Sequence, residues 1–573
     1  MSPRLRQALL LAVAVAVFLA IGAVWLWRFR RGQPVDIDEA GYLSIAITDY
    51  RGLSDGGPGG FADAVMGPSI WAPLMTSLTA PVFLVTGTGV LPGLLVPLLF
   101  GGVMVLAAYG LGHAVGGRAT GWVALAITAG APVVIGYSRS YNFAIASGAT
   151  VAVMLWAIVR SRTFDRLGWS AAAGAAIGLV ALSRTLTLAF LPVLVLIGLV
   201  ALAAGPDRRR RAVNLLVAAG TSLVVAGPWY YRNGEGVLDY LTSYGYGKSS
   251  TSYGRDQSVL SPESWRVTAV YVISQNGLPM VLLWVLGPMV AVGALVVAGR
   301  RLGAGEALLR ACRSPLVPSL LWLAWCLAAL TSSGNKGSGF VAPLVPAFAV
   351  VTAWAVWRLP RPAAWTLAGV AAATLALNTA VSVDPRPGWV EPLSVDAPWV
   401  DRATVYDGSG VIQGYVGYER PELAGGQLSE DEAAAWKRTQ DRLVADLTEL
   451  GPGRVFTVFG FRHRLVNMNT VQLEQLLDGG EILPVTMIDP VKVPNDERAM
   501  VRYLTTGGVA TACLLLTARG TEMEFEPIVD DELMILAARD AGFERLTTLD
   551  LPGPRTVVVW RRPSTCPVEP GPS

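Results

Sequence analysis

The sequence predicts a polytopic α-helical membrane domain followed by a water-soluble α/β domain. Hydrophobic residues make up 53% of the 573 residues and charged residues only 15%, whereas soluble domains carry about 25% charged residues. Apolar runs of about 20 residues, long enough to cross a bilayer, recur between residues 8 and 382. Residues 1–383 hold 27 Lys+Arg and 13 Asp+Glu, giving +14, and residues 384–573 hold 18 and 29, giving −11. This pattern excludes a typical soluble enzyme, a disordered protein and a nucleic-acid binder.

The apolar segments predict about 11 to 13 spans. The first resembles a signal peptide but is too long and lacks a small-residue cleavage site, so we expect an uncleaved span. Segment 70–87 contains Pro73 and Pro81, and either spans the membrane or forms a re-entrant piece. The segments are 8–27, 70–87, 91–112, 120–137, 143–159, 169–183, 186–204, 212–230, 279–299, 316–332, 340–358 and 363–382.

Short basic loops predict the orientation, because such loops stay on the cytoplasmic side. They place the N-terminus inside and everything after residue 383 outside. The outer side would then hold a first loop (28–69), an aromatic loop (231–278) and the C-terminal part, so the activity is expected at that face. The basic loops are Arg160–Arg166, Arg208–Arg211, Arg300–Arg313 and Arg358–Arg361.

The C-terminal part predicts an extracytoplasmic α/β domain over 384–562 and a disordered tail over 563–573. Strand-like runs alternate with helical ones, which is typical of a small doubly wound or mixed sheet. No nucleotide-binding glycine motif is present. Cys513 and Cys566 either pair or remain two single thiols. The predicted strands are 454–459, 482–488, 511–517 and 556–560, and the predicted helices 471–477, 496–504 and 530–541.

Three carboxylates, Asp36, Asp38 and Glu39, follow the first span. Close carboxylates repel one another unless they bind a cation, face a basic partner or titrate for a task. Alternatively, they mark an exposed helix N-terminus, with Asp36 capping a helix over 38–50. From the pattern alone the capping interpretation is favoured.

Basic and aromatic residues on the predicted outer side are candidates for binding a phosphate or a sugar. Arg184 lies between two apolar runs and either faces a cavity or reaches to the interface. Lys336 lies in a glycine-rich loop that suits a phosphate or is simply flexible. Tyr244 and Tyr246 either stack on sugar rings or form an aromatic belt. The predicted spans contain no Asp or Glu, which argues against an ion-driven carrier.

Four short motifs follow one another along the membrane part. They are Asp38-Glu39-Ala-Gly-Tyr42, Gly67-Pro68-Ser-Ile-Trp71-Ala-Pro73, Pro228-Trp229-Tyr-Tyr-Arg232-Asn233 and Phe340-Val-Ala-Pro343-Leu-Val-Pro346. In this order they resemble motifs of the GT-C superfamily of membrane glycosyltransferases that use polyprenyl-phosphate sugars. The chain is most similar to the family of the protein O-mannosyltransferases and the lipid A aminoarabinose transferase. The loop 136–142, by contrast, lacks the second carboxylate that this family often has.

The resemblance implies transfer of a sugar to an acceptor hydroxyl on a glycan, lipid or protein, in cell-envelope synthesis. Asp38 would be the general base, with Glu39 beside it. Asp36, Tyr42, Tyr244 and Tyr246 would bind the acceptor or sugar, and Asp36, Asp38 and Glu39 would hold a divalent cation (Mg, Mn or Ca) if one is used. The donor phosphate would meet basic residues, in falling order Arg184, Arg139, Lys248 and Lys336.

Two other functions stay open on the sequence: a non-catalytic envelope scaffold, and a flippase for lipid-linked sugars. We expect residence in the cytoplasmic membrane, and no nucleic-acid partner. Only four of the 45 basic residues are Lys, which favours a GC-rich genome such as that of an actinobacterium.

Overall fold

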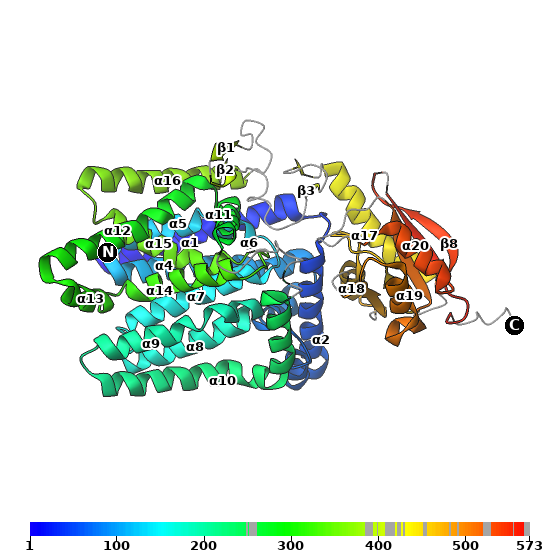
Figure 1. The fold of residues 1–573 in the computed structure, drawn as a ribbon, viewed down its shortest axis with the longest axis horizontal. Coiled ribbons are helices and arrows are strands. Elements are labelled where there is room, and N and C mark those ends of the chain that lie inside the picture. Colours follow the sequence, from blue (N-terminus) through cyan, green and yellow to red (C-terminus); the bar gives the residue numbers. More distant parts are fainter. Residues whose placement is uncertain are drawn as a thin grey trace. The chain divides into compact units, whose positions relative to one another are not determined.

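The computed structural model shows a mostly helical, multi-pass membrane protein with a small C-terminal sheet, which confirms the predicted fold class (Figure 1). The structure describes residues 1–247, 250, 261–337, 339–383, 393–397, 399–406, 419–420, 426–427, 430–450, 455–480, 483–489, 492–519, 529–553 and 555–566.

The chain divides into two compact units. The membrane unit comprises Met1–Arg28, Gly52–Val82 and Leu91–Tyr415, and the C-terminal unit comprises Phe29–Arg51, Phe83–Val90 and Val416–Ser573. The predicted boundary after residue 383 stays a prediction. This division groups the segment after the first span with the C-terminal part of the chain.

Seven helical stretches in the described part of the chain are long and apolar enough to cross a bilayer. The spanning stretches are Pro3–Arg30, Val90–Gly116, Phe143–Arg160, Thr185–Ala204, Arg208–Gly245, Leu278–Leu302 and Arg361–Ala380. A bent pair, Ala304–Cys312 with Val317–Ser332, turns by 92° and adds an eighth span if it counts as one. Three shorter apolar helices are Leu74–Thr86, Leu167–Ser183 and Ala342–Val356. The count of about 11 to 13 spans stays a prediction.

The helical elements of the first 383 residues follow the predicted apolar segments closely. They are α1 (Pro3–Trp25), η1 (Leu26–Arg30), α2 (Ile37–Val65), α3 (Leu74–Thr86), α4 (Val90–Gly116), α5 (Arg118–Ala129), α6 (Pro132–Tyr137), α7 (Phe143–Arg160), α8 (Leu167–Ser183), η2 (Thr185–Phe190), α9 (Val193–Ala204), α10 (Arg208–Tyr240), η3 (Leu241–Gly245), α11 (Pro262–Asn276), α12 (Leu278–Leu302), α13 (Ala304–Cys312), α14 (Val317–Ser332), η5 (Ala342–Leu344), α15 (Val345–Val356) and α16 (Arg361–Val383).

Local sequence explains where these helices begin and how closely they pack. Asn142 caps α7 by accepting a hydrogen bond from the amide of Ala144 at 3.0 Å, the usual role of an Asn at this position. In α8, Gly174 and Gly178 form a small-xxx-small pattern, and a Cβ at Gly174 would lie 2.1 Å from the carbonyl oxygen of Ala218 in α10. Glycine therefore lets α8 and α10 pack backbone to backbone, and the two lie side by side in Figure 1.

Two regions expected to be loops are largely helical. The predicted first outer loop forms α2, whose helical dihedrals break only at Gly57 (φ 60°). The first part of the aromatic loop continues α10 through η3, and its last part forms α11. Gly234 and Gly236 lie within α10 and do not end it. The proline-rich segment 70–87 forms α3, which rises only about 20 Å and is shorter than the ~30 Å hydrocarbon core.

Three of the four basic loops meet at one end of the membrane unit. Arg210 forms an ion pair with Asp165, and Arg211 donates to the carbonyl oxygen of Thr163. Arg313 Nε donates to the carbonyl oxygen of Ala204 at 2.9 Å. The loops that the positive-inside rule assigns to the same side are therefore in contact with one another.

The C-terminal unit contains a five-stranded mixed sheet in the order β6-β5-β7-β9-β8. Strands β6, β5 and β7 are parallel, whereas β9 pairs antiparallel with both β7 and β8. Leu514, Leu516 and Val559 belong to its core. The elements are α17 (Glu430–Leu450), β5 (Thr457–Phe459), α18 (Met468–Leu477), β6 (Val485–Met487), α19 (Glu497–Thr505), η6 (Gly507–Thr511), β7 (Leu514–Arg519), α20 (Asp531–Asp540), β8 (Glu544–Asp550) and β9 (Thr556–Arg561), preceded by short pairs β1 (Leu393–Ala397) with β2 (Asp401–Tyr406) and β3 (Glu419–Arg420) with β4 (Gly426–Gln427).

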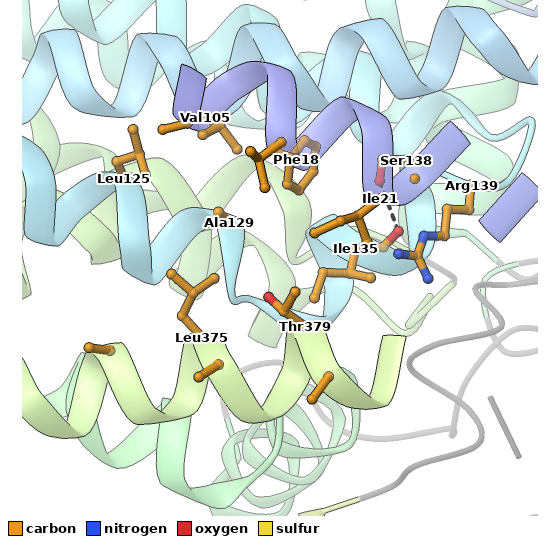
Figure 2. A pocket seen from close by; sticks show the side chains of 16 residues that line it. Phe18, Ile21, Val105, Leu125, Ala129, Ile135, Ser138, Arg139, Leu375 and Thr379 are labelled. Atoms are coloured by element: carbon orange, nitrogen blue, oxygen red, sulfur yellow. Dashed lines mark hydrogen bonds between the residues drawn. The ribbon is translucent and has the colours of Figure 1, made fainter. Parts of the chain in front are cut away.

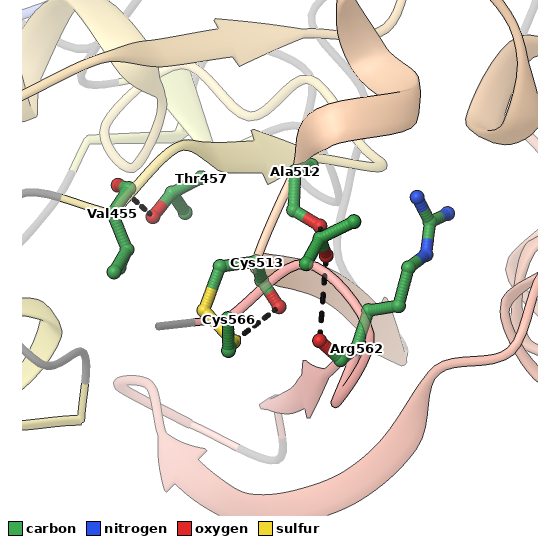
Figure 3. The surroundings of a disulfide bond; sticks show 7 residues. Val455, Thr457, Ala512, Cys513, Arg562 and Cys566 are labelled. Atoms are coloured by element: carbon green, nitrogen blue, oxygen red, sulfur yellow. Dashed lines mark hydrogen bonds between the residues drawn. A yellow bond between two sulfur atoms is a disulfide. The ribbon is translucent and has the colours of Figure 1, made fainter. Parts of the chain in front are cut away.

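A disulfide joins Cys513, just before β7, to Cys566, just after β9 (Figure 3). Their Cα atoms are 4.7 Å apart, within the range that a disulfide spans. Of the two alternatives that the sequence left open, the structure has the paired one. The disulfide also orders the first part of the predicted tail, since Cys566 is buried, while residues 567–573 lie outside the described residues.

Candidate functional site

The three carboxylates lie at the start of α2, within the C-terminal unit. Asp36 Oδ1 accepts a hydrogen bond from the amide of Asp38 at 2.9 Å, and the amide of Ala40 donates to the carbonyl oxygen of Asp36 at 2.8 Å. Asp36 is therefore the N-cap of α2, as the capping interpretation expected. That interpretation also expected an exposed helix N-terminus, whereas Asp36 and Glu39 are buried beside basic partners. The helix dipole favours the acidic side chains of Asp38 and Glu39 in this first turn.

The three carboxylates have different surroundings. Asp36 and Glu39 are fully buried, whereas Asp38 is half-buried. Glu39 Oε2 lies 2.6 Å from Arg30 Nη2, and both side chains are 0% exposed. Asp36 Oδ2 lies 3.9 Å from Arg464 Nε. Asp38 is thus the carboxylate of the three that a substrate could reach.

Burial raises the pKa of Asp36 well above its usual range, against the opposing attraction of Arg464. The charges of Asp38 and Glu39 raise it further. A buried carboxylate with this pKa serves as a cap and a structural link more readily than as a ligand. Tyr42 lies one helical turn beyond Asp38 and is buried.

The described residues contain no group of three His, Cys, Asp or Glu side chains arranged to hold a metal ion. Glu39 is engaged by Arg30, and Asp36 is buried beside Arg464. A divalent cation needs several oxygen ligands that face one point. The three carboxylates as placed do not fit such an ion.

Arg184 lies at the junction of α8 and η2, in the membrane unit. Its guanidinium carbon is 4.2 Å from the centroid of the Phe340 ring, a cation–π contact. The amide of Phe340 donates to the hydroxyl of Tyr271 at 3.1 Å, and that hydroxyl donates to the carbonyl oxygen of Gly337 at 2.6 Å. Arg184 therefore packs against a loop that α11 holds in place.

Lys336 has a structural role in that loop. Its Nζ donates to the carbonyl oxygens of Leu330 and, at 2.6 Å, of Ser333, at the C-terminal end of α14. Burial lowers the pKa of Lys336 to about 8. A lysine that caps a helix C-terminus satisfies carbonyl groups that would otherwise lack partners. The predicted phosphate ligand Lys248 lies outside the described residues.

Tyr244 and Tyr246 lie at the helical end of α10 and η3 rather than in a mobile loop. The Tyr240 and Tyr244 rings are 5.1 Å apart. Tyr246 is 51% exposed, and its hydroxyl donates to the carbonyl oxygen of Ala329 at 3.4 Å. Asn335 Nδ2 donates to the carbonyl oxygen of Tyr244 at 3.0 Å, so this aromatic end is joined to the loop of Lys336.

The glycine at position 339 brings the Arg139 and Arg184 regions together. Gly339 has φ +76°, and a Cβ there would lie 2.3 Å from the Cβ of Ala144 and 3.0 Å from the Tyr137 ring. Loop 137–144, which carries Arg139, therefore packs against the loop whose Phe340 lies under Arg184. A side chain at 339 would separate them.

Arg139 lies at one end of an apolar groove in the membrane unit. Figure 2 shows its guanidinium beyond Ile135, at the opposite end of the cavity from Leu125. The cavity has a volume of about 530 Å³, within the range of ligand sites. Its lining comes from α1, α4, α5, α6, the turn that follows α6, and α16, and is apolar apart from Ser138, Arg139 and Thr379.

Arg139 is only 3% exposed, and its guanidinium carbon lies 4.9 Å from the Trp25 ring centroid. Burial lowers the pKa of Arg139 to about 9, which leaves it charged at neutral pH. A groove lined by hydrocarbon with a cation at its end matches a lipid that carries a phosphate. The sequence ranked Arg184 above Arg139 because Arg184 interrupts two apolar runs, whereas no sequence signal reveals the groove.

Reasoning from the sequence also missed Arg30, Gln440, Arg464 and Asn469. All four contact the segment that contains the carboxylates. Arg30 could have been suspected, because it lies on the outer side of the first span against the positive-inside rule. The other three are more than 400 residues away in the chain and carry no local signal.

No family profile and no curated protein matches the sequence. Solved structures do match it. ArnT from Cupriavidus metallidurans has a TM-score of 0.55 at 15% identity, covering 97% of this chain and 98% of ArnT in the apo state. The same protein bound to undecaprenyl phosphate gives a TM-score of 0.54 at 15% identity, covering 96% and 97%.

Two other proteins share this similarity. The archaeal oligosaccharyltransferase AglB from Archaeoglobus fulgidus, with an inhibitory peptide and a dolichol-phosphate, has a TM-score of 0.53 at 11% identity, covering 89% of this chain and 69% of AglB. A complex of the A. fulgidus enzyme with Zn and sulfate has a TM-score of 0.53 at 12% identity, covering 97% and 74%.

Arabinofuranosyltransferase AftD from Mycobacteria has a TM-score of 0.53 at 14% identity, covering 98% of this chain and 40% of AftD. The chain thus spans less than half of AftD. At these identities the likeness concerns the fold: this chain shares the fold of ArnT, AglB and AftD, which agrees with the fold that its motifs predicted.

Proposed function

We propose that this protein is a membrane glycosyltransferase that moves a sugar from a polyprenyl-phosphate carrier to an acceptor hydroxyl on the outer face of the cytoplasmic membrane. The observation that carries the proposal is the groove of the membrane unit, with Arg139 at its end, on a GT-C fold. The prenyl chain would occupy the apolar part of the groove, and its phosphate would meet the Arg139 guanidinium. Arg184 is a second candidate for the phosphate.

The bound molecules of the structural neighbours support this donor class. The matched structure of ArnT holds undecaprenyl phosphate, and that of AglB holds a dolichol-phosphate. Both ligands combine a long apolar chain with a phosphate, which is the chemistry that suits the Arg139 groove. The acceptor class stays open among glycan, lipid and protein.

In the proposed reaction the acceptor oxygen attacks the anomeric carbon of the sugar. The bond from that carbon to the phosphate oxygen breaks, and the polyprenyl phosphate leaves with the bonding electron pair. The acceptor proton passes to the carboxylate of Asp38, late in the transition state. A guanidinium stabilises the charge that develops on the leaving phosphate. Glu39 is bound to Arg30, so its proposed role is to fix the start of α2.

The basic loops gathered at one end of the membrane unit suit the cytoplasmic side. For the C-terminal unit an extracytoplasmic location is proposed. The disulfide between Cys513 and Cys566 suits an oxidising compartment. Tyr42, Tyr244 and Tyr246 stay candidates for contacts with the acceptor or sugar, and an actinobacterial source and an envelope role stay predictions.

The test is donor turnover by purified wild type and by Asp38→Asn in detergent. Each is incubated with a panel of polyprenyl-phosphate sugars and a crude envelope fraction, and the polyprenyl phosphate released is measured by mass spectrometry. We expect the variant to lose activity by about 100-fold or more, the range for removal of a general base. The matched control is Asp63→Asn on the same helix, where the side chain is exposed, and it should keep full activity.

Other outcomes lead to different functions. Release that is unchanged in Asp38→Asn would contradict Asp38 as the base. Binding of donors without release by the wild type would favour the flippase, because transport needs no transfer. If the wild type neither binds the donors nor releases polyprenyl phosphate, a non-catalytic scaffold function would be favoured.

A further inference from the structure

The segment that carries Asp38 is bound by side chains of α17 and of the stretch from His463 to Asn469. All of these residues belong to the C-terminal unit. Residues 34–36 precede α2 and Ile37 begins it, so the amides of this segment have no helical partners. Both backbone groups of Val35 and the carbonyl oxygen of Ile37 are paired with side chains from more than 400 residues later in the chain.

Gln440 of α17 makes the central contact. Its Oε1 accepts a hydrogen bond from the amide of Val35 at 3.1 Å, and its Nε2 donates to the carbonyl oxygen of Val35 at 2.8 Å. The same Nε2 donates to the carbonyl oxygen of Leu465 at 2.6 Å. Gln440 is 2% exposed and Val35 is 1% exposed. One side-chain amide thus pairs with both backbone groups of Val35, as a neighbouring β-strand would.

Two further side chains bind the segment on either side of Asp36. Asn469 Nδ2 donates to the carbonyl oxygen of Ile37 at 2.9 Å, and Arg464 faces the Asp36 carboxylate. A Cβ at Gly41 would lie 3.0 Å from Asn469 Nδ2, so Asn469 also rests against the next turn of α2. These side chains therefore contact residues both before and after Asp38 in the chain.

The C-terminal unit holds these side chains rigidly. The Trp436 ring stacks on His463 with centroids 4.9 Å apart. His463 Nδ1 accepts hydrogen bonds from the amides of Leu465 and Val466. Asn467 and Thr470 form a capping box that starts α18 beside Asn469. Buried side chains with satisfied partners supply the support that a precisely placed group needs.

We propose that Gln440 and Asn469 are positioning residues, through which the C-terminal unit fixes the orientation of Asp38. The inference rests on the proposed function, since it takes Asp38 as the base. It gives the C-terminal unit a role within the reaction, because a misplacement of about 1 Å can reduce a rate about 100-fold. Arg464 adds an electrostatic contact to the same segment.

The test combines amide hydrogen exchange with kinetics on the full-length protein. The variants are Gln440→Leu and the milder Asn469→Ala, which removes a single bond and leaves the buried core intact. The matched control is Gln475→Leu. Gln475 is also a buried glutamine, and its Oε1 accepts from the amide of Leu483 at 2.7 Å rather than from residues 34–37.

We expect exchange over residues 34–40 to become about tenfold faster or more in both variants, because a buried hydrogen bond is lost. We expect kcat to fall by about tenfold or more, while the KM for the donor changes by less than about twofold. A general loss of structure would also lower the apparent kcat, but in proportion to the folded fraction, so kcat is expressed per folded protein. Gln475→Leu should leave exchange over 34–40 and kcat unchanged.

Three results would overturn the inference. Unchanged exchange over 34–40 in both variants would show that these side chains do not hold the segment. Faster exchange with unchanged kcat would show that holding it does not matter for turnover. The same fall in kcat in Gln475→Leu would point to stability alone. A wild type without transferase activity but with a protected segment would refute the proposed function and leave the structural contact standing.

Discussion

The two units differ in what surrounds a buried charged side chain. In the C-terminal unit, Arg30 and Glu39 form an ion pair in which neither side chain is exposed. In the membrane unit, Arg139 lies against an aromatic ring at the end of an apolar groove. The ion pair is closed within the protein, whereas the cation at the end of the groove is the one for which we propose an anionic ligand. Burial alone therefore does not identify a binding residue.

The largest effect is expected when the buried pair is broken. Glu39→Leu leaves the Arg30 guanidinium buried without its carboxylate, and such a change costs about 3–5 kcal/mol. We expect a marked fall in the midpoint of thermal unfolding and in the yield of folded protein, measured in detergent.

The control for this prediction is the double variant Arg30→Met with Glu39→Leu. Replacement of both partners by apolar side chains is often neutral, so the double variant should recover most of the lost stability. Arg442→Ala, in an exposed pair with Asp446, should cost less than about 1 kcal/mol. A double variant as unstable as Glu39→Leu would argue against the pair as the cause.

A second large effect concerns the disulfide. Replacement of Cys513 and Cys566 by Ala removes a link across 53 residues, and loss of a native disulfide costs about 2–5 kcal/mol. The unfolding midpoint of the C-terminal unit should fall, and a phosphine reductant should lower it in wild type but not in the variant. Cys312→Ala serves as control, because Cys312 is free. Four reactive thiols in unreduced, denatured wild type would contradict the disulfide.

The sequence predicted those features that arise from local periodicity. Apolar runs indicated the membrane helices, and β-branched runs such as Thr556–Trp560 indicated buried strands. Strand β8 (Glu544–Asp550) was missed because most of it is exposed and its sequence does not alternate. Helix α17 was missed because many of its residues are charged, and its buried face is evident only once its partners are known.

In the candidate site, too, local features could be predicted from the sequence, whereas contacts between distant positions could not. Asp36 as a helix cap could be predicted, because a cap acts on amides two or three residues away. The contact between Gln440 and Val35 could not, because it joins positions 405 apart. The groove beside Arg139 depends on five separate segments of the membrane unit, so no single stretch of sequence predicts it.

The third prediction tests the cation in the groove. Arg139→Met keeps the apolar volume and removes the charge. Loss of a charge-assisted hydrogen bond of about 1.5–3 kcal/mol should raise the donor KM by about 10- to 100-fold, with a small effect on stability. The control is Arg358→Met: Arg358 also stacks on a tryptophan, Trp354, at 4.9 Å, but lies at a basic loop. An unchanged donor KM in Arg139→Met would remove Arg139 from the donor site.

The smallest effect is expected from Asp36→Asn, which changes another buried carboxylate of the C-terminal unit. The effect is a dependence of the protein's stability on pH. Asn keeps the capping oxygen for the amide of Asp38. Burial raises the pKa of Asp36 in the folded protein. The stability that this group contributes is therefore fully present below its unfolded pKa of about 3.9. It is lost as the pH rises through the folded pKa.

Asp36→Asn should therefore gain stability relative to wild type as the pH rises from acid toward neutral, measured as the difference in unfolding midpoint at several pH values. The control is Asp530→Asn, because Asp530 caps α20 in the same way but is exposed. A change with pH of the same size and direction in Asp530→Asn would mean that loss of a charged cap, and not burial, causes the effect. If the unfolding midpoint of Asp36→Asn instead falls relative to wild type as the pH rises, the attraction of Arg464 outweighs the effect of burial on the Asp36 carboxylate. The Asp36–Arg464 contact would then be a second ion pair like that of Arg30 and Glu39.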